Sequence, residues 1–392
     1  MSADTPHLTP GRRLALRRIQ RGMSRRTLAE LIGRSEEWLR LIETGARPLD
    51  SVQAVVRLAE VLRLRDPAEL LDGFPPRQRT PIQLGTEDPW DELRTAAVEP
   101  PQAGSVATIG VDDLWHQWRF CSRRSTTLRQ ELPIRLAELR SAWQDRTGDE
   151  ALAASLIDAY HLARSMVGGS EPGLALLVAD RAVALAERDA PLRRAAAARN
   201  LAMALLQTGD YARALRLAQT VAASIGDRPP ADRPELLLWG SLQSIAAKAA
   251  ARRNDIENTR RLLAAAADAA ARAAFDDAHH NVWFGPSDLH LTRMSTAINL
   301  GQLQEIPVLA AEAEFSDGYP PTLQAAYYVM LAYVYARRHD AAAAAMALDR
   351  VEQLCADEIT DNATVTRTLH LLLQHQPVPA EIRRLARLAG IL

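Results

Sequence analysis

Apolar residues near the start of the chain recur at helical spacing in four short groups, at positions 14–19, 28–32, 39–42 and 52–62. Glycines mark the turns between or after these groups: Gly22, Gly33 and Gly45. Each group spans only two or three helical turns, and such a helix cannot bury its apolar stripe alone. The pattern therefore predicts a small bundle of four or five short helices joined by tight turns.

The second and third of these helices predict a DNA-binding function. Ser24 and Ser35 each stand directly before an apolar group, as N-cap residues do, and the turn at Gly33 separates the two helices. This arrangement is typical of a helix-turn-helix. Positions 1–65 hold thirteen arginines against seven acidic residues, a net charge of +6, whereas the whole chain carries −1. Positive charge concentrated in this way suits contacts with DNA phosphates.

Several short motifs in this segment carry a family resemblance, in order: Leu16-Arg17, Gly22 before Ser24, Leu28-Ala29, Gly33-x-Ser35, Ile42-Glu43-x-Gly45 and Leu58-Ala59. The segment resembles the five-helix, Cro- and lambda-repressor-like DNA-binding domains of the xenobiotic-response-element regulator family. The resemblance implies a recognition helix over 34–44. The residues that it places on DNA are Arg25, Arg26 and Arg47 at phosphates, Trp38 at the sugar-phosphate wall, and Ser35, Glu36, Glu37 and Arg40 at base edges.

Two carboxylates depart from the usual pattern of the recognition helix. Relatives place small or amide residues where this chain has Glu36 and Glu37, and a carboxylate near DNA is unfavourable unless it accepts a hydrogen bond from a cytosine amino group. Either the protein recognises cytosine or its base readout is weak. Trp38 has packing as an alternative role, and we expect Glu43 to pair with an arginine of the same bundle.

A stretch rich in proline and glycine follows at 72–110, with a short helix expected within it at 88–97. The sequence thus predicts a DNA-binding domain at 1–71, a linker at 72–110 and a second domain at 111–392. The second domain consists of alanine- and leucine-rich amphipathic helices without the alternation of β-strands. The predicted fold class is all-α.

The second domain contains degenerate helix-pair repeats. The segment Arg199–Ile225, with Gly209-Asp210-Tyr211 at its turn, resembles one tetratricopeptide unit. Weaker copies have their turns at Ser170, Asn254, Gly301 and His339. Such units stack into a right-handed superhelix whose concave face binds peptides or other ligands. The residues expected on that face are Asn200, Gln207, Gln243, Arg293, Asn299 and Tyr327.

The segment Ala274–His290 breaks the alanine-rich pattern. A metal site made of His279, His280 and His290 with Asp276 or Asp288 is disfavoured, because adjacent histidines on a helix point about 100° apart. The Phe284-Gly285-Pro286 turn resembles a segment of repeat-containing regulators of actinobacteria. By that resemblance Trp283, Phe284, Asp288 and His290 are candidate ligand-binding residues.

The cysteines, the absence of known motifs and the lack of long apolar runs limit the classes of function that we expect. Two isolated cysteines predict neither disulfides nor a zinc site, and no motif indicates a cofactor or a catalytic centre. The chain lacks an apolar run that could span a membrane and an N-terminal signal peptide, so we expect a cytoplasmic protein.

Together these features predict a homodimeric transcriptional regulator that binds double-stranded DNA and responds to a peptide or small-molecule effector. Two alternatives remain open: an interaction scaffold with a vestigial DNA-binding domain, and a small-molecule-binding or biosynthetic protein that uses the helical repeats as its pocket.

Overall fold

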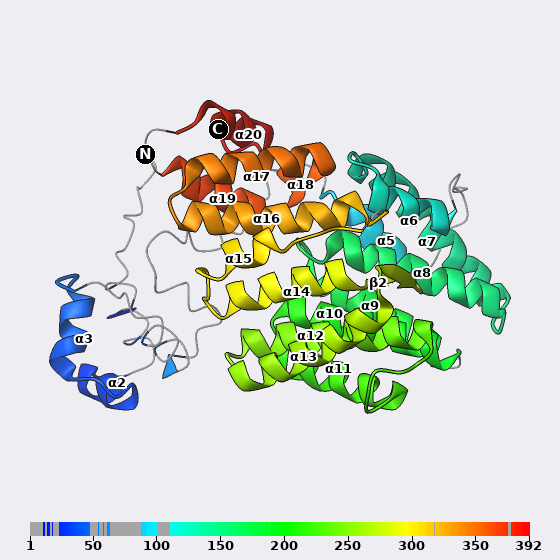
Figure 1. The fold of residues 1–392 in the computed structure, drawn as a ribbon, viewed down its shortest axis with the longest axis horizontal. Coiled ribbons are helices and arrows are strands. Elements are labelled where there is room, and N and C mark those ends of the chain that lie inside the picture. The colour runs from blue at the N-terminus through cyan, green and yellow to red at the C-terminus, as the bar shows by residue number, and fades with distance from the viewer. Residues whose placement is uncertain are drawn as a thin grey trace. The chain divides into compact units, whose positions relative to one another are not determined.

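A computed structural model of the protein describes residues 11, 14–15, 18, 23–47, 54, 58, 61–62, 88–99, 110–187, 189–316, 318–374 and 378–392. The chain divides into two compact units, Met1–Glu87 and Asp88–Leu392 (Figure 1). Within the described residues the secondary structure is almost entirely helical, as the sequence predicts.

Unit 1 contains the predicted helix pair, α2 (Arg25–Leu31) and α3 (Glu36–Glu43). Gly33 has a φ of 69°, which glycine adopts without the steric penalty of other residues, and it provides the turn between them. The predicted core residues are buried, as expected: Leu14, Leu28, Ala29, Leu39 and Ile42. The family motifs at Leu16-Arg17 and Gly22 lie outside the described residues, so the number of helices in this unit stays a prediction.

Unit 2 begins with a short helix, α5 (Asp91–Val98), inside the segment predicted to be a linker. Leu93 and Ala97 are buried in a cluster with residues of α7 (Ser125–Asp145). Arg140 of α7 and Arg181 of α9 (Pro172–Ala186) donate hydrogen bonds to carbonyl groups at the end of α5. This part of the segment therefore packs as a component of unit 2.

Most of the other helices form consecutive pairs. The pairs are α8 (Glu150–Val167) with α9, α10 (Pro191–Thr208) with α11 (Tyr211–Ile225), α12 (Arg233–Arg252) with α13 (Ile256–Ala273), α14 (Pro286–Asn299) with α15 (Ile306–Ala311), and α16 (Pro321–Arg337) with α17 (Ala341–Leu354). The last helices are α18 (Asp357–Asp361), α19 (Ala363–Leu373) and α20 (Ala380–Leu388).

Three of the predicted repeat turns share one construction. Gly209, Asn254 and His339 have positive φ values of 87°, 58° and 62°. In each case the next residue is an aspartate whose carboxylate accepts a hydrogen bond from the backbone N–H three positions later. A left-handed residue thus ends one helix and an Asp N-cap begins its partner.

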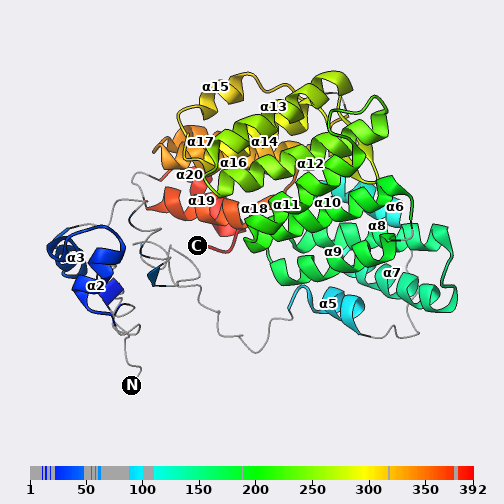
Figure 2. The same ribbon diagram turned by 90° about the horizontal axis from the view of Figure 1, so that it is seen from below.

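The first helices of the pairs close a ring together with α6 (Val111–Phe120). In chain order α6, α8, α10, α12, α14 and α16 each contact the next, and α16 contacts α6. We call this set the inner ring. Figure 2 shows α9 to α13 as adjacent helices. Because α12 touches neighbours on both sides as well as α11 and α13, nearly all of its residues are buried.

The segment Ala274–His290 contains a β-hairpin, a feature absent from the helical prediction. Strands β1 (Asp277–His279) and β2 (Val282–Phe284) pair in antiparallel fashion, and His280 and Asn281 form the turn with φ values of 47° and 62°. Two successive positive φ values are typical of a type I′ turn, which matches the twist of a hairpin. His279 and His280 thus lie on a hairpin and not on a helix.

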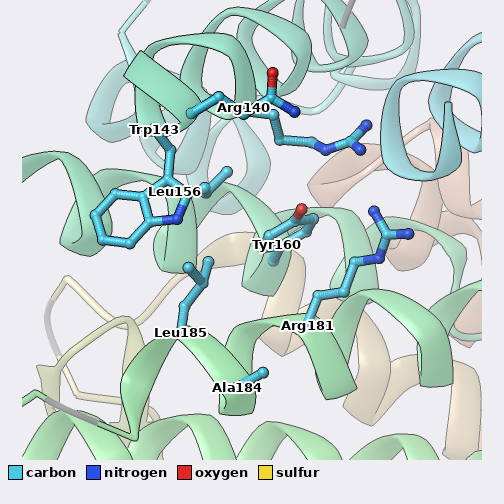
Figure 3. Close-up of a pocket in the computed structure, with 8 residues that line it drawn as sticks. Arg140, Trp143, Leu156, Tyr160, Arg181, Ala184 and Leu185 are labelled. Atoms are coloured by element: carbon cyan, nitrogen blue, oxygen red, sulfur yellow. The ribbon is translucent and has the colours of Figure 1, made fainter. Parts of the chain in front are cut away.

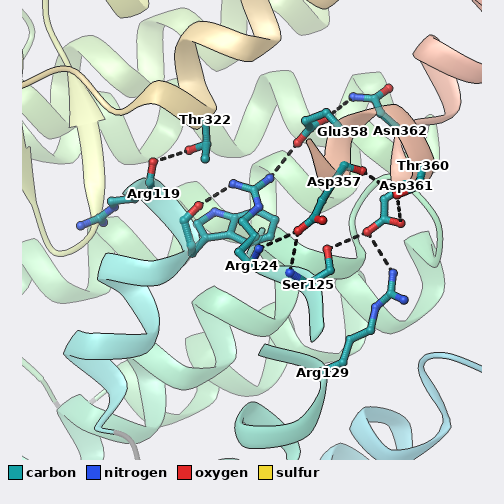
Figure 4. Close-up of polar contacts among 11 residues, drawn as sticks. Arg119, Arg124, Ser125, Arg129, Thr322, Asp357, Glu358, Thr360, Asp361 and Asn362 are labelled. Atoms are coloured by element: carbon teal, nitrogen blue, oxygen red, sulfur yellow. Dashed lines mark hydrogen bonds and ion pairs between the residues drawn. The ribbon is translucent and has the colours of Figure 1, made fainter. Parts of the chain in front are cut away.

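Hydrogen bonds between distant segments reinforce the closure of unit 2 (Figure 4). The Asp357 carboxylate of α18 accepts hydrogen bonds from the backbone N–H groups of Arg124 and Ser125, at 2.6 and 2.8 Å, and so caps the start of α7. The Arg124 guanidinium pairs with Glu358 at 2.7 Å. Thr322 of α16 donates to the carbonyl of Arg119 in α6. Residues more than 200 positions apart therefore join α18 to α7 and α16 to α6.

No helix among the described ranges combines the length and the apolar character that a membrane crossing requires.

Candidate functional site

The recognition helix predicted at 34–44 corresponds to α3, whose start carries a side-chain cap. Ser35 Oγ accepts a hydrogen bond from the backbone N–H of Trp38 at 3.1 Å. Glu36 and Glu37 follow in the first turn, where negative charge interacts favourably with the helix dipole. Their position at the N-terminus gives these two acidic residues a physical reason to be present besides base recognition.

The exposed side of α3 carries the paired residues Glu37 and Arg40. The carboxylate and the guanidinium form two hydrogen bonds of 2.6 and 2.7 Å. This hydrogen bond to Arg40 lowers the pKa of Glu37. The pair occupies Nε and Nη2 of Arg40 and places a carboxylate beside the guanidinium, so it opposes a two-hydrogen-bond contact of Arg40 with a base.

The buried side of α3 carries a polar network centred on Glu43, as expected from the sequence. The Glu43 side chain is only 1% exposed and accepts hydrogen bonds from Arg18 and Arg25, both with shortest distances of 2.6 Å. Burial alone would raise the pKa of Glu43, but the two arginines outweigh this effect and the pKa lies below its ordinary value. Arg25 is therefore a structural partner of Glu43, in addition to its predicted role at a phosphate.

The other predicted DNA contacts lie on the surface of unit 1. Arg26 and Arg47 are exposed, and the Arg34 guanidinium lies 5.6 Å from the centre of the half-buried Trp38 ring. Trp38 also packs against the apolar cluster of unit 1, which agrees with a packing role. Arg40 and Arg47 remain the most accessible cations at and just after α3.

Comparison with known proteins supports the assignment of α2 and α3 to a helix-turn-helix. Residues 11–72 match a family model described as a helix-turn-helix domain. The N-terminal unit contains a helix-turn-helix domain. Such a domain indicates a DNA-binding regulator. No curated protein and no solved structure matches the chain.

The ligand-binding residues predicted in unit 2 come from α10, α12, β2, α14 and α16, and the rings of two of them, His290 and Tyr327, lie 6.4 Å apart. Asn200 is buried, and its amide donates to the carbonyl of Ala196 in its own helix. Gln207 is exposed near the end of α10, whereas Gln243 is buried in α12 and Arg293 and Asn299 are half-buried on α14. The Tyr327 hydroxyl donates to the carbonyl of Ala310. Several of these side chains thus already have partners within the fold.

Of the candidate residues in the hairpin region, Trp283 and Phe284 pack against other side chains, and Asp288 and His290 lie on α14 of the inner ring. Phe284 is fully buried against Gly240 of α12, where a β-carbon would come within 2.2 Å of the ring, so Phe284 has no surface to offer to a ligand. Trp283 packs edge-on against Tyr319, with ring centres 6.0 Å apart. Asp288 and His290 lie on opposite faces of α14 because they are two positions apart. In the described part of the chain, no cluster of residues fits a metal ion.

The inner ring holds a group of charged and polar residues, most of which the sequence analysis missed. They come from four successive helices: His161 and Arg164 of α8, Arg199 of α10, Ser241, Ser244 and Lys248 of α12, and Asp288 and Thr292 of α14. We call these residues the ring cluster. Residues 241, 244 and 248 lie on one face of α12, and 288 and 292 lie on one face of α14. The sequence feature that could have revealed them is the recurrence of polar residues at 241, 244 and 248, at helical spacing in the alanine- and leucine-rich helix α12.

Electrostatic interactions show that the charged members of the ring cluster are close together. Burial lowers the pKa of Lys248 and of Arg199, and the carboxylate of Asp288 partly opposes both shifts. Burial lowers the pKa of Arg164 to about 9, and the neighbouring charge of Arg199 adds to this shift. Burial and the two cations of Arg164 and Arg199 lower the pKa of His161 to about 3, so this imidazole is neutral at pH 7.

A separate pocket of about 310 Å³ lies between α7, α8 and α9. Trp143, Leu156, Tyr160 and Leu185 form its apolar part (Figure 3). Figure 3 shows the guanidinium groups of Arg140 and Arg181 on the side away from the Trp143 ring. Since both arginines are hydrogen-bonded to carbonyl groups of α5 or directly after it, this pocket lies where α5 is attached.

Proposed function

We propose that the protein is a homodimeric transcriptional regulator of the xenobiotic-response-element type, in which α3 enters the major groove of duplex DNA. The observation that carries this proposal is the helix-turn-helix domain, with α2 and α3 joined at Gly33. The positive charge of the first 65 residues and the exposed Arg47 support it.

In this proposal the helical pairs of unit 2 form a tetratricopeptide-like effector domain. Its support is the ring cluster, whose polar groups are enclosed by successive first helices, the position where helix-pair repeats bind their ligands. An effector that binds one arrangement of the ring more tightly would shift the population of dimers. The two DNA-binding domains would then be separated by more or less than one helical turn of DNA, about 34 Å.

The test is binding of the purified full-length protein to genomic DNA fragments over a series of salt concentrations. Arg47→Ala removes an exposed cation next to α3, and Arg253→Ala, which removes an exposed cation at the end of α12, is the control. We expect Arg47→Ala to weaken binding to all fragments and to reduce the slope of log K against log salt by about one. The control should bind like the wild type.

Arg25 is unsuitable for this test, since its loss would also disturb Glu43. If the wild type binds no fragment at low salt, with and without added cell extract as a source of effector, the proposed function is wrong. In that case unit 2 is the part of the protein whose partners should be sought.

A further inference from the structure

We propose that the effector of this protein carries an oxyanion, and that Arg164, Arg199 and Lys248 bind it inside the inner ring. The inference rests on the proposed effector domain and adds to it the chemical class of the ligand and the residues that recognise it. The shared chemistry is that of a phosphate or carboxylate group.

The first argument is an excess of positive charge. The ring cluster contains three cations, Arg164, Arg199 and Lys248, and one carboxylate, Asp288. The nearby acidic side chains have partners outside the cluster. Asp276 accepts hydrogen bonds from Ser287 and Ser316 at 2.6 and 2.7 Å. Asp158 Oδ2 lies 3.8 Å from Arg193, while Asp158 Oδ1, which has no hydrogen bond among the described residues, lies 4.0 Å from His161 Nδ1. Charges removed from water without a counter-charge are unfavourable, so the cluster favours an anion of about two charges.

The second argument is a set of buried polar atoms without partners. Among the described residues, Arg164 Nε, Ser244 Oγ, Thr292 Oγ1 and both imidazole nitrogens of His161 make no hydrogen bond, although all four side chains are more than nine-tenths buried. Buried polar groups almost always have partners, and exceptions point to a missing ligand or water. These atoms come from α8, α12 and α14, which also carry Arg164, Lys248 and Asp288.

The third argument is accessibility. Arg199, Lys248 and Asp288 are only half-buried, so they keep surface that a ligand can reach. Arg199 Nε donates to Ser241 Oγ at 3.0 Å, which fixes the guanidinium between α10 and α12. Within the part of the chain that the structure describes, the Lys248 ammonium has no hydrogen bond and no ion pair. A guanidinium fork and a free ammonium are the groups that proteins use for phosphate and carboxylate.

The chemistry of the donors decides between classes of ligand. Arg164, Arg199, Lys248 and the hydroxyl groups of Ser244 and Thr292 all donate hydrogen bonds, whereas Asp288 is the one charged acceptor in the cluster. A cationic ligand would meet three like charges, and a neutral apolar one would leave the donors unpaired. The cluster thus matches an oxyanion and discriminates against the other two classes.

The experiment measures thermal unfolding of the full-length protein without DNA, in inorganic phosphate or in succinate, against chloride at equal ionic strength. We expect one or both anions to raise the Tm above the chloride value, by an amount that grows with the logarithm of concentration. A larger effect of phosphate indicates a phosphorylated effector, and a larger effect of succinate indicates a carboxylate.

Variants of Lys248 separate this site from the arginines of the DNA-binding domain. Lys248→Met should raise the Tm without added anion, because it removes an uncompensated charge, and should abolish the response to the anion. Lys248→Arg should keep the response, and Arg253→Gln, an exposed charge change at the end of the same helix, should leave both values unchanged.

The proposal is wrong if no anion raises the wild-type Tm above chloride, if Lys248→Met keeps the full response, or if Lys248→Met lowers the Tm without anion. The last result would make Lys248 a structural partner. An anion response in a protein that binds no DNA would leave this inference standing and refute the proposed regulator.

Discussion

The Glu43 network of unit 1 and the ring cluster of unit 2 differ in how their buried charges are paired. In unit 1 the Glu43 carboxylate receives hydrogen bonds from Arg18 and Arg25, so the network is complete within the domain. In the ring cluster of unit 2, His161, Ser244 and Thr292 have unpaired polar atoms and Lys248 has no ion pair among the described residues. A completed network stabilises a fold, whereas an incomplete one keeps binding capacity for a ligand. Burial of a charge is therefore not by itself a sign of function. The informative feature is whether the buried charge has a partner within the fold.

The largest expected effect comes from breaking the completed network. Glu43→Ala leaves the buried Arg18 without its counter-charge, and we expect the free energy of unfolding of unit 1 to fall by about 3–5 kcal/mol. Hydrogen exchange of the backbone amides of α2 and α3 in the full-length protein would measure it. Glu36→Ala, at an exposed position of α3, should stay within about 0.5 kcal/mol. Equal losses in the two variants would contradict a structural role for Glu43.

The same network predicts acid sensitivity of unit 1. The folded pKa of Glu43 is lowered, so its stabilisation is present above the ordinary value of 4.5 and is lost as the pH falls through the folded pKa. We expect protection of the α2 and α3 amides to decrease below about pH 4.5 and Glu43→Gln to lose this dependence. A dependence that persists in Glu43→Gln would assign it to other groups.

The centre of unit 2 has fewer paired polar groups than the Glu43 network of unit 1. We therefore expect the stability of unit 2 to depend more on apolar packing. Gly240→Ala would place a β-carbon 2.2 Å from the buried Phe284 ring, and overpacking of this kind costs about 1–3 kcal/mol. Denaturant unfolding followed by circular dichroism would measure the loss. Gly173→Ala, where a β-carbon meets no atom within 4 Å, is the control. No difference between the two variants would show that β2 can move away from α12 without loss.

A smaller effect is expected from the titration of His161, which makes the free energy of unfolding of unit 2 depend on pH. Its pKa is about 3 in the folded protein, below the ordinary 6.5, because of burial and the charges of Arg164, Arg199, His280 and Arg193. The unfolded chain binds the proton first, so unit 2 loses up to about 1.4 kcal/mol per pH unit as the pH falls below 6.5. His161→Leu should flatten the dependence, while exposed His370→Gln should not.

The smallest effect on stability is expected at the exposed pair on α3. Glu37→Gln removes the carboxylate that holds Arg40, and an exposed pair of this kind contributes little to folding. The unfolding of unit 1 should be unchanged, but DNA affinity at low salt should rise several-fold because Arg40 is released and a negative charge is lost. An unchanged or lower affinity would favour recognition of cytosine by Glu37.

Much of the fold was accessible from the sequence, because apolar spacing and turn residues determine local structure. The helices around Gly33, the buried Leu28 and Leu39, and the turn at Gly209 all follow from patterns within a few residues. The hairpin was missed because it holds only three residues per strand and is fixed by the positive φ values of His280 and Asn281. A turn of this type depends on backbone conformation that apolar periodicity does not reveal.

The ligand-binding residues were harder to predict than the helices. The choice of Asn200 and Phe284 depended on resemblance, yet Asn200 bonds within its own helix and Phe284 completes the core. Arg199, one position before Asn200, belongs to the ring cluster instead, and a shift of one residue turns a side chain by about 100° around a helix. Which face points inward depends on contacts among α8, α10, α12 and α14, which are distant in sequence.

The cap that Asp357 provides for α7 has a consequence for the synthesis of the protein. Arg124 and Ser125 leave the ribosome more than 230 residues before their partners in α18. During translation the start of α7 therefore has exposed N–H groups, and the final contacts of unit 2 join its two ends over a long loop. A chain that stops before Asp357 would lack this bond, so unit 2 is expected to reach its final packing only after α18 has been synthesised.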